Sequence, residues 1–424
     1  MAKWREKLPG LGRKLLILAL LVSAALLLRE TGYLSGISRR FRPGENTDIT
    51  DASSLADPRS AGMVQPLAAV VCGADGGRYG AAYDRETVMG VFQRFSVDIV
   101  EALGSAGTPE AITPEEFQDC LSRNGVLLRF YGSQPLALLS VCLGGEMRGE
   151  AEAYRAELLC LCADGEGVAL CFRTEDGDYY RCTTAVPQEG LQARTGEYTP
   201  NGASYAFELP LLSGSDGCAV ILEGAVQSAV VQCGIPLPSG DETDALLEAV
   251  GMNSYGARSY TEADGTVVFV GDGMTLRLAP TGAVSFRRTG AANNVGSYSL
   301  TGAVTAAWAL AEQSIGKSCG DAVLFLADVQ ESEGQRVCTV SLDYAVNGVP
   351  VRQASGPAAQ IVFRDGVPVQ ATLAFRRYTL TEKRETLLPG LQAAAMAAKA
   401  DATAELIYPD GGESMHCIWV KSDG

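Results

Sequence analysis

Cysteine is the residue type through which this chain could do the most chemistry. The 424 residues include twelve cysteines, and an even number in an exported chain favours disulfides. Most of them stand in apolar, strand-like runs such as residues 158–162 and 169–172, where a free thiol behaves as a small buried hydrophobic group. We therefore interpret most of them as reduced core thiols, with disulfides as the alternative. The positions are Cys72, Cys120, Cys142, Cys160, Cys162, Cys171, Cys182, Cys218, Cys233, Cys319, Cys338 and Cys417.

One pair of cysteines has a spacing that raises the question of metal binding. Cys160 and Cys162 are two residues apart on a predicted strand, so both thiols lie on the same face of it. Structural zinc sites surround the ion with four ligands and typically use a C-x2-C pair, which the sequence lacks. Two thiols on one strand face are poor metal geometry, and we expect no metal site.

The other residue types common in active sites form no recognisable catalytic pattern in this sequence. His416 is the only histidine, and we predict that it is a structural residue of a C-terminal strand. With one histidine we expect no Ser-His-Asp or Cys-His arrangement and no site built on several histidine ligands, and no GxxxxGK[ST] phosphate loop occurs. Carboxylates such as Asp321, Asp328 and Asp343 are dispersed, although a glycosidase pair brought together by the fold is an alternative. We predict no catalytic residues, no cofactor and a protein that is not an enzyme.

The charge is distributed unevenly along the chain. The net charge is −16, but residues 1–42 hold nine Lys or Arg and two Asp or Glu. The remainder therefore holds 25 basic and 48 acidic residues, a net charge of −23. An acidic body is repelled by nucleic acid and by anionic lipid headgroups, so we expect neither as its partner.

The basic N-terminus is followed at once by an apolar run from Leu15 to Leu28. Its fourteen residues reach about 21 Å as a helix, against roughly 30 Å of hydrocarbon. An extended helix over residues 11–33, with Lys14 and Arg29 snorkelling, would span. The alternative is a cleaved signal peptide with a site at Val22-Ser23-Ala24. We favour a single-pass anchor in the cell membrane, with a cytoplasmic N-terminus and an extracytoplasmic body.

Three small residues of this run could contact another membrane helix. Ala19, Ser23 and Ala24 would allow close helix approach in lipid, and they are our candidate transmembrane contact residues. The alternative is that these residues are ordinary parts of the anchor helix and make no specific contact.

Composition and turn signals divide the chain into five parts. Residues 1–42 form the cytoplasmic tail and anchor, and residues 43–65 form a linker rich in Asp, Ser, Pro and Gly. Residues 66–238 form an N-terminal extracytoplasmic α+β domain. Residues 239–297 form a middle domain of one helix and a meander, and residues 298–424 form a C-terminal α+β domain. The expected fold class is α+β: one transmembrane helix, then two to three domains of antiparallel sheet packed with helices.

Hydrophobic periodicity places the elements of the first domain. It predicts a strand over 67–72, helices over 83–103 and 114–124, and then strands over 126–131, 136–143, 156–163, 167–174 and 179–185. The second helix has an N-terminal signature in Thr113-Pro114-Glu115-Glu116.

The rest of the chain shows one plan twice, a helix followed by antiparallel strands, which we interpret as a divergent structural repeat. The middle domain is predicted to contain a helix over 241–250 and strands over 258–261, 266–271, 275–279 and 283–287. The last domain is predicted to contain helices over 299–315 and 389–400 and strands over 322–331, 336–346, 360–364, 367–378, 404–408 and 416–421.

Several motifs follow the N-terminal anchor in a fixed order. They are Tyr260-Thr261-Glu262-Ala263-Asp264-Gly265, Asp343-Tyr344-Ala345-Val346-Asn347-Gly348-Val349-Pro350-Val351, Tyr408 and Trp419-Val420. Their order resembles the YycH and YycI family of extracytoplasmic accessory proteins of Gram-positive bacteria. The similarity is best over residues 239–424, with the length and the additional N-terminal domain closer to YycH.

The resemblance implies a regulator of a WalK-type sensor histidine kinase that controls cell-wall metabolism. Its partners would be the kinase and a related accessory membrane protein, and the family has no catalytic residues to carry over. Two alternatives follow from the sequence. One is a PepSY-like extracytoplasmic binding module that restrains an envelope hydrolase, and the other is an envelope carbohydrate enzyme.

Overall fold

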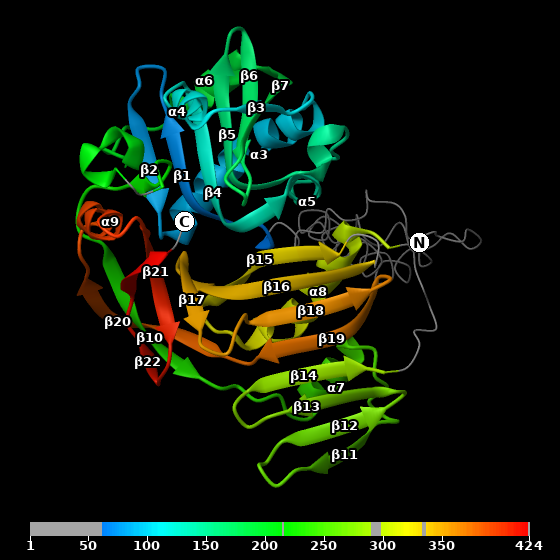
Figure 1. Cartoon of the computed structure of the whole chain (residues 1–424). Helices are drawn as coiled ribbons and strands as arrows, with labels where there is room; N and C mark the ends of the chain where they lie inside the picture. The colour runs from blue at the N-terminus through cyan, green and yellow to red at the C-terminus, as the bar shows by residue number, and fades with distance from the viewer. Residues whose placement is uncertain (1–61, 214–215, 290–297, 333–335, 423–424) are drawn as a thin grey trace, which may run out of the picture. The chain divides into compact units, whose positions relative to one another are not determined.

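A computed structural model describes residues 62–213, 216–289, 298–332 and 336–422 (Figure 1). The N-terminal part of this range is a seven-stranded antiparallel sheet in the order β2-β1-β4-β5-β6-β7-β3. Its strands are β1 (Pro66–Cys72), β2 (Arg78–Ala82), β3 (Glu110–Ile112), β4 (Gly125–Pro135), β5 (Arg155–Asp164), β6 (Gly167–Arg173) and β7 (Tyr179–Pro187).

Helices cover both faces of this sheet. The long helix α3 (Arg85–Gly104) begins at Asp84, whose side chain accepts a hydrogen bond from the Thr87 N–H, and its buried residues follow helical spacing. The short helix α4 (Pro114–Leu121) covers the opposite face and begins with a capping box between Thr113 and Glu116. The remaining helical segments of this part are α5 (Leu136–Cys142), η3 (Glu150–Ala153) and α6 (Gln188–Thr195).

The prediction of a strand over residues 136–143 is wrong, because this segment forms helix α5. A short run that is apolar except for Ser140 carries no periodicity that separates a strand from a buried helix. Leu136, Leu139 and Ser140 are fully buried at helical spacing, and they pack beside α3.

An 11-stranded sheet forms the other large part, in the order β11-β12-β13-β14-β19-β18-β16-β17-β21-β23, with β15 paired to β16. Its one parallel pairing joins β17 to β21. The strands are β11 (Arg258–Thr261), β12 (Val267–Gly271), β13 (Met274–Leu278), β14 (Ala283–Arg288), β15 (Ala322–Ser332), β16 (Val337–Val346), β17 (Val349–Gln353), β18 (Ala359–Arg364), β19 (Val367–Ala374), β21 (Thr403–Asp410) and β23 (Ile418–Ser422).

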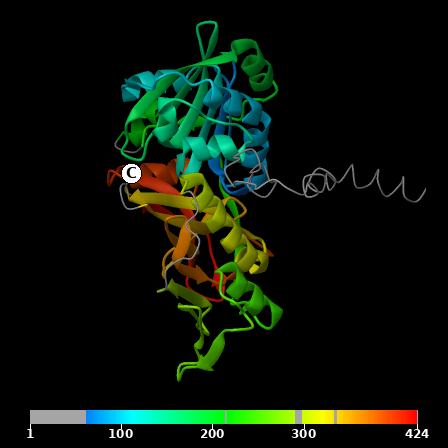
Figure 2. The ribbon, with the colours of Figure 1, turned by 90° about the vertical axis from the view of Figure 1, so that its right-hand side faces the viewer.

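Helices α7 (Asp241–Ala249) and α8 (Leu300–Ser314) contact each other and lie along one face of this sheet (Figure 2). The helix α9 (Gly390–Ala398) packs on β21, and η6 (Gly316–Ser318) follows α8. The predicted meander over 258–287 is confirmed as β11 to β14, and its last strand pairs with β19. The expected division between residues 239–297 and 298–424 therefore runs through one continuous sheet.

A three-stranded sheet interleaves distant segments of the chain. Strand β10 (Gln227–Gly234) lies between β20 (Arg377–Thr386) and β22 (Ser414–Met415), and Val231 pairs with Leu380 on one side and Met415 on the other. The prediction of a single strand over 367–378 is wrong at this point, because the chain leaves the large sheet after β19 and enters this one as β20. Smaller elements before it are β8 (Ser204–Tyr205), β9 (Val220–Ile221), η4 (Ala206–Glu208) and η5 (Pro210–Leu212).

Side chains of the N-terminal part cover the free edge of β15. The carbonyl of Leu324 accepts a hydrogen bond from Gln65 Nε2 at 2.9 Å, and the carbonyl of Leu326 accepts one from Gln134 Nε2 at 3.0 Å. The Arg155 guanidinium donates to the carbonyl of Val329. These bonds give partners to backbone carbonyls at the edge of the sheet, where no further strand pairs with β15.

The antiparallel α+β class is borne out, whereas the expected anchor at residues 11–33 lies outside the described residues. Within the part of the chain that is described, no helix combines the length and the apolar character that a membrane crossing requires.

Candidate functional site

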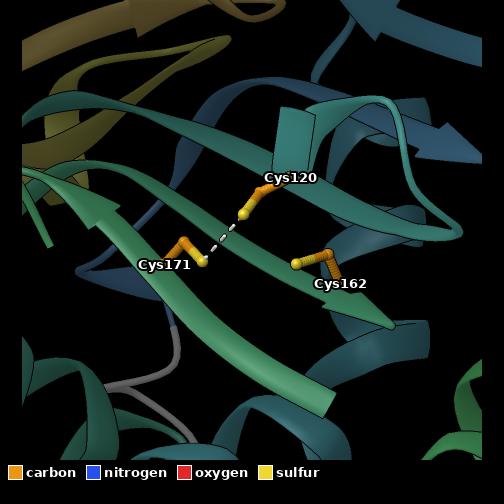
Figure 3. A group of neighbouring side chains, drawn as sticks. All are labelled: Cys120, Cys162 and Cys171. Carbon is orange, nitrogen blue, oxygen red and sulfur yellow. Dashed lines mark hydrogen bonds between the residues drawn. The ribbon is translucent and has the colours of Figure 1, made fainter. Parts of the chain in front are cut away.

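Four cysteines converge between α4 and the sheet. Cys160 and Cys162 lie on one face of β5, and Cys171 on β6 is the register partner of Cys160 and shares that face. Cys120 on α4 lies over them. The Sγ atoms of Cys120, Cys162 and Cys171 all lie within 4.8 Å of one another, and the thiol of Cys171 contacts that of Cys120 at 3.6 Å (Figure 3).

The surroundings of this thiol cluster, by which we mean Cys120, Cys160, Cys162 and Cys171, are apolar and closed to water. Each of the four residues is at most 2% exposed. The other side chains of the same buried cluster include Phe117, Leu127, Leu158 and Tyr205, and Tyr179 packs against it.

Within the cluster Cys162 is the group that carries negative charge most readily. Hydrogen bonds from the thiols of Cys120, Cys160 and Cys171 lower the pKa of Cys162 far below its ordinary value, against the effect of burial. The interaction with Cys162 in turn raises the pKa of Cys120 to about 11, and it raises the pKa values of Cys160 and Cys171.

A cationic group of side chains stands beside the cluster. Asp164 pairs with two guanidinium groups, that of Arg123 at 3.0 Å and that of Arg181. Two arginines on one carboxylate leave one net positive charge, and Arg123 favours the thiolate forms of Cys120 and Cys162.

The spacing in the sequence singles out Cys160 and Cys162 as a pair but does not indicate the cluster. Cys120 is some forty residues earlier in the chain and Cys171 lies on the next strand, so only the fold brings them together. The one available signal was Cys171, since the tight β5–β6 hairpin places it opposite Cys160. All twelve cysteines are free thiols in the structure, and all except Cys233 are buried.

A second feature is a cleft of about 770 Å³ lined by β4, β5 and β6 and by residues of the C-terminal strands. Four of its charged side chains form a closed ring. Arg173 pairs with Asp216 at 2.7 Å and with Glu157 at 2.9 Å, while Arg129 pairs with the same two carboxylates at 3.3 Å and 3.2 Å.

The ring favours the charged forms of Asp216 and Arg173. Burial opposes the ionisation of Asp216, but Arg129 and Arg173 lower the pKa of its carboxyl. Burial likewise opposes the charge of Arg173, yet Asp216 and Glu157 raise the pKa of its guanidinium. The two positive and two negative charges cancel, and a carboxylate fixed in this way is a poor general acid.

A smaller hollow of about 350 Å³ adjoins the cleft and shares Tyr131, Arg352 and Glu405 with it. Burial raises the pKa of Asp343 in this hollow to about 6, and the Ala358 N–H donates to its carboxylate at 3.0 Å. Asp321 and Asp328, the other dispersed carboxylates considered in the sequence, make contacts away from this hollow. Asp321 accepts from the Leu380 N–H, and Asp328 pairs with Arg155.

Ala19, Ser23 and Ala24 lie outside the described residues. His416 lies between β22 and β23 rather than in a strand, and its Nδ1 contacts Glu385 at 2.8 Å. This surface contact agrees with a structural role.

Comparison with known proteins identifies no relative. No protein-family model matches the chain, and no significant match is found among curated proteins or solved structures.

Proposed function

We propose that this chain is a non-enzymatic regulator anchored in the cell membrane, whose extracytoplasmic body binds a sensor histidine kinase and a related accessory membrane protein. The kinase would control cell-wall metabolism. The motif resemblance supports this identity of the partner, and the structure of the body supports binding rather than catalysis.

The resemblance motifs fall on the 11-stranded sheet. Tyr260 to Gly265 form the end of β11 and the turn into β12, while residues 343–351 form the β16–β17 hairpin. Tyr408 lies on β21 and Trp419 on β23. Motifs that are far apart in the sequence therefore share one structural unit.

The free edge of β11 is the observation that carries the proposal. Among the described strands, β11 pairs only with β12 and ends the sheet, and all four of its residues are exposed. Tyr260 is 54% exposed, and Tyr255 just before the strand is 98% exposed. An exposed edge can accept one more strand from a partner, and tyrosines are frequent anchors of such contacts.

The charged side chains of the cleft, in contrast, pair with one another and so favour a structural role. Its ring of Arg129, Glu157, Arg173 and Asp216 is internally neutralised. A catalytic carboxylate pair works through two groups whose pKa values are held apart. Asp343, the nearby carboxyl with a raised pKa, lies in the adjoining hollow and is not a member of this ring. This arrangement supports a protein that acts by docking.

Crosslinking in cells tests the proposal. The full-length chain would be crosslinked in its membrane and purified, alongside a Tyr255→Ser/Tyr260→Ser variant and a control, Leu211→Ser/Met396→Ser, which removes two exposed apolar residues elsewhere. We expect the kinase with the wild type and the control, and about tenfold less with the tyrosine variant. Wild-type protein that recovers no kinase contradicts the proposal.

Two other results would identify the alternatives. Recovery of an envelope hydrolase in place of the kinase would favour the PepSY-like binding module. Hydrolysis of cell-wall glycans by the purified body would establish an enzyme.

The contribution of the anchor has its own test. A body exported without residues 1–42 is compared with the full-length chain and with a chain carrying an unrelated single-pass anchor. We expect kinase regulation only from the native anchor, because Ala19, Ser23 and Ala24 would contact the kinase in the membrane. Full regulation by the exported body would remove the anchor from the mechanism.

A further inference from the structure

We propose that the thiol cluster binds one thiophilic metal ion with a filled d shell, Zn(II) or Cu(I), through Cys120, Cys162 and Cys171, with Cys160 as the adjacent fourth sulfur. The site would hold α4 against the sheet. This inference does not depend on the proposed regulatory function.

The geometry of the sulfurs fits such an ion. A zinc–thiolate bond of about 2.3 Å places the sulfurs of a tetrahedral site about 3.8 Å apart. The Cys120 and Cys171 sulfurs are 3.6 Å apart, and all three pairs are within 4.8 Å. The three ligands come from α4, β5 and β6, so small side-chain rotations bring them around a common centre.

The neighbouring charge favours such a site as well. Four thiolates around Zn(II), or three thiolates around Cu(I), carry two net negative charges. The group of Arg123, Asp164 and Arg181 beside the cluster carries one net positive charge. An ion buried in a low-dielectric interior requires such compensation.

A disulfide and plain core packing are the competing explanations. A Cys120–Cys171 disulfide would use two sulfurs and leave Cys160 and Cys162 without a role. Plain packing describes a cysteine such as Cys182, which is equally buried on β7 among aliphatic and aromatic side chains of the other face. Four sulfurs converging from three elements beside a compensating cation distinguish the cluster.

The number of sulfurs bound separates the two ions. Zinc takes four ligands in a closed site, which requires Cys160 to turn toward the others. Cu(I) is a soft ion suited to thiolate ligands and would be satisfied by the three sulfurs that already lie together. Both ions displace thiol protons, so the affinity for either should rise with pH.

Metal analysis of the full chain tests the proposal. The protein would be produced without oxygen in medium supplemented with zinc or with copper, purified with a non-thiol reductant, and its metal content measured. Cys162→Ala is compared with Cys182→Ala, since both cysteines are fully buried in the same sheet. We expect about one ion per chain in the wild type and in Cys182→Ala, and about tenfold less metal in Cys162→Ala.

A spectroscopic measurement on the wild type guards against a variant that fails to fold. Co(II) titrated into the wild type should give thiolate-to-metal charge-transfer absorption, with tetrahedral d–d bands if Cys160 joins and zinc is the native ion. Wild-type protein that binds neither zinc, copper nor cobalt overturns the proposal. Equal metal content in the two variants, or a Cys120–Cys171 disulfide in protein produced without oxygen, also overturns it.

Discussion

Two carboxyl groups near the cleft, Asp216 and Asp343, are in opposite electrostatic environments. Asp216 faces Arg129 and Arg173, which lower the pKa of its carboxyl in spite of burial. Asp343 has one backbone N–H donor and a more distant arginine, so burial prevails and raises its pKa to about 6. The two residues should therefore respond to pH in opposite directions.

Replacing Asp216 should destabilise the protein at neutral pH. Asp216→Asn leaves Arg129 and Arg173 with one carboxylate between them, at a cost of roughly 3–5 kcal/mol. Because the folded-state pKa is lowered, the contribution of Asp216 is present above pH 4 and is lost as the pH falls through that lowered value. Urea unfolding of both proteins between pH 3 and pH 8 measures this, and the difference should shrink toward pH 3.

The control for this prediction is Glu197→Gln. Glu197 pairs with Arg94 on the surface, with both side chains about half exposed, and exposed pairs contribute little. If Glu197→Gln lowered the free energy of unfolding as much as Asp216→Asn, the ring would contribute no more than an exposed ion pair, which contradicts the prediction.

Replacing Asp343 should have the opposite effect. Its raised pKa means that folding opposes ionisation, so the penalty is absent below about pH 4, grows through pH 6 and is complete above it. Asp343→Asn keeps an acceptor for the Ala358 N–H and should gain roughly 1–2 kcal/mol at pH 7.5 and nothing at pH 4. Unfolding at the two pH values is the measurement.

Asp176→Asn, at an exposed turn, serves as the reference. It should leave the free energy of unfolding unchanged at both pH values. A loss of stability in Asp343→Asn at pH 7.5 would show that the carboxylate makes a contact that compensates its burial.

At the scale of elements, the β16–β17 hairpin does more than reverse the chain. Asn347 and Gly348 both have a positive φ, as the Asn-Gly signal predicts for a type I′ turn. The turn also packs against the start of α3, since a Cβ on Gly348 would lie 2.8 Å from the Arg85 backbone nitrogen. The Gly348 carbonyl accepts a hydrogen bond from Tyr131 at 2.8 Å.

Gly348→Ala should therefore cost more than an ordinary turn substitution. The β18–β19 turn contains a matched glycine, Gly366, which also has a positive φ but no neighbour within 4 Å of its Cβ position. We expect Gly366→Ala to lose about 1 kcal/mol from backbone strain alone, and Gly348→Ala to lose roughly 2–4 kcal/mol because a backbone atom must move. Equal losses in thermal or urea unfolding would contradict the contact with α3.

The elements that could be predicted from the sequence are those with a local cause. The helix α4 was found from Thr113 and Glu116, and the meander β11–β14 from its turns at close spacing. Helix α5 was missed because a seven-residue apolar run has no distinguishing period. The thiol cluster and the Arg129 ring do not follow from local pattern, because sheet register joins their strand residues and tertiary packing adds Cys120 from α4 and Asp216 from the loop before β9.

At the scale of the whole molecule, β4 and β15 approach very closely. A Cβ on Gly132 would lie 2.0 Å from the Ala327 carbonyl oxygen. This contact lies beside the hydrogen bonds from Gln65, Gln134 and Arg155 that cover the edge of β15. The seven-stranded and the 11-stranded sheets thus meet through backbone, with little room for change.

Gly132→Ala should separate these two strands and destabilise the protein by roughly 2–4 kcal/mol. Gly90→Ala provides a control of opposite sign, because Gly90 is exposed in the middle of α3 with nothing near its Cβ position. Alanine there should stabilise the helix by about 0.5–1 kcal/mol. Thermal unfolding of the three proteins measures both effects, and an unchanged midpoint for Gly132→Ala would mean that the strands can move apart freely.

The position of β10 has a consequence for how the protein is made. Val231 pairs with Leu380 and Met415, so both neighbours of β10 are synthesised well over a hundred residues after it. A chain that emerges N-terminus first must keep this strand, with its buried Val230 and Val231, from other partners until residues 414–415 have appeared. Strand β10 therefore stays unpaired until the later strands are available. A chaperone that binds the unpaired strand in the compartment where the body folds would reduce aggregation during that interval.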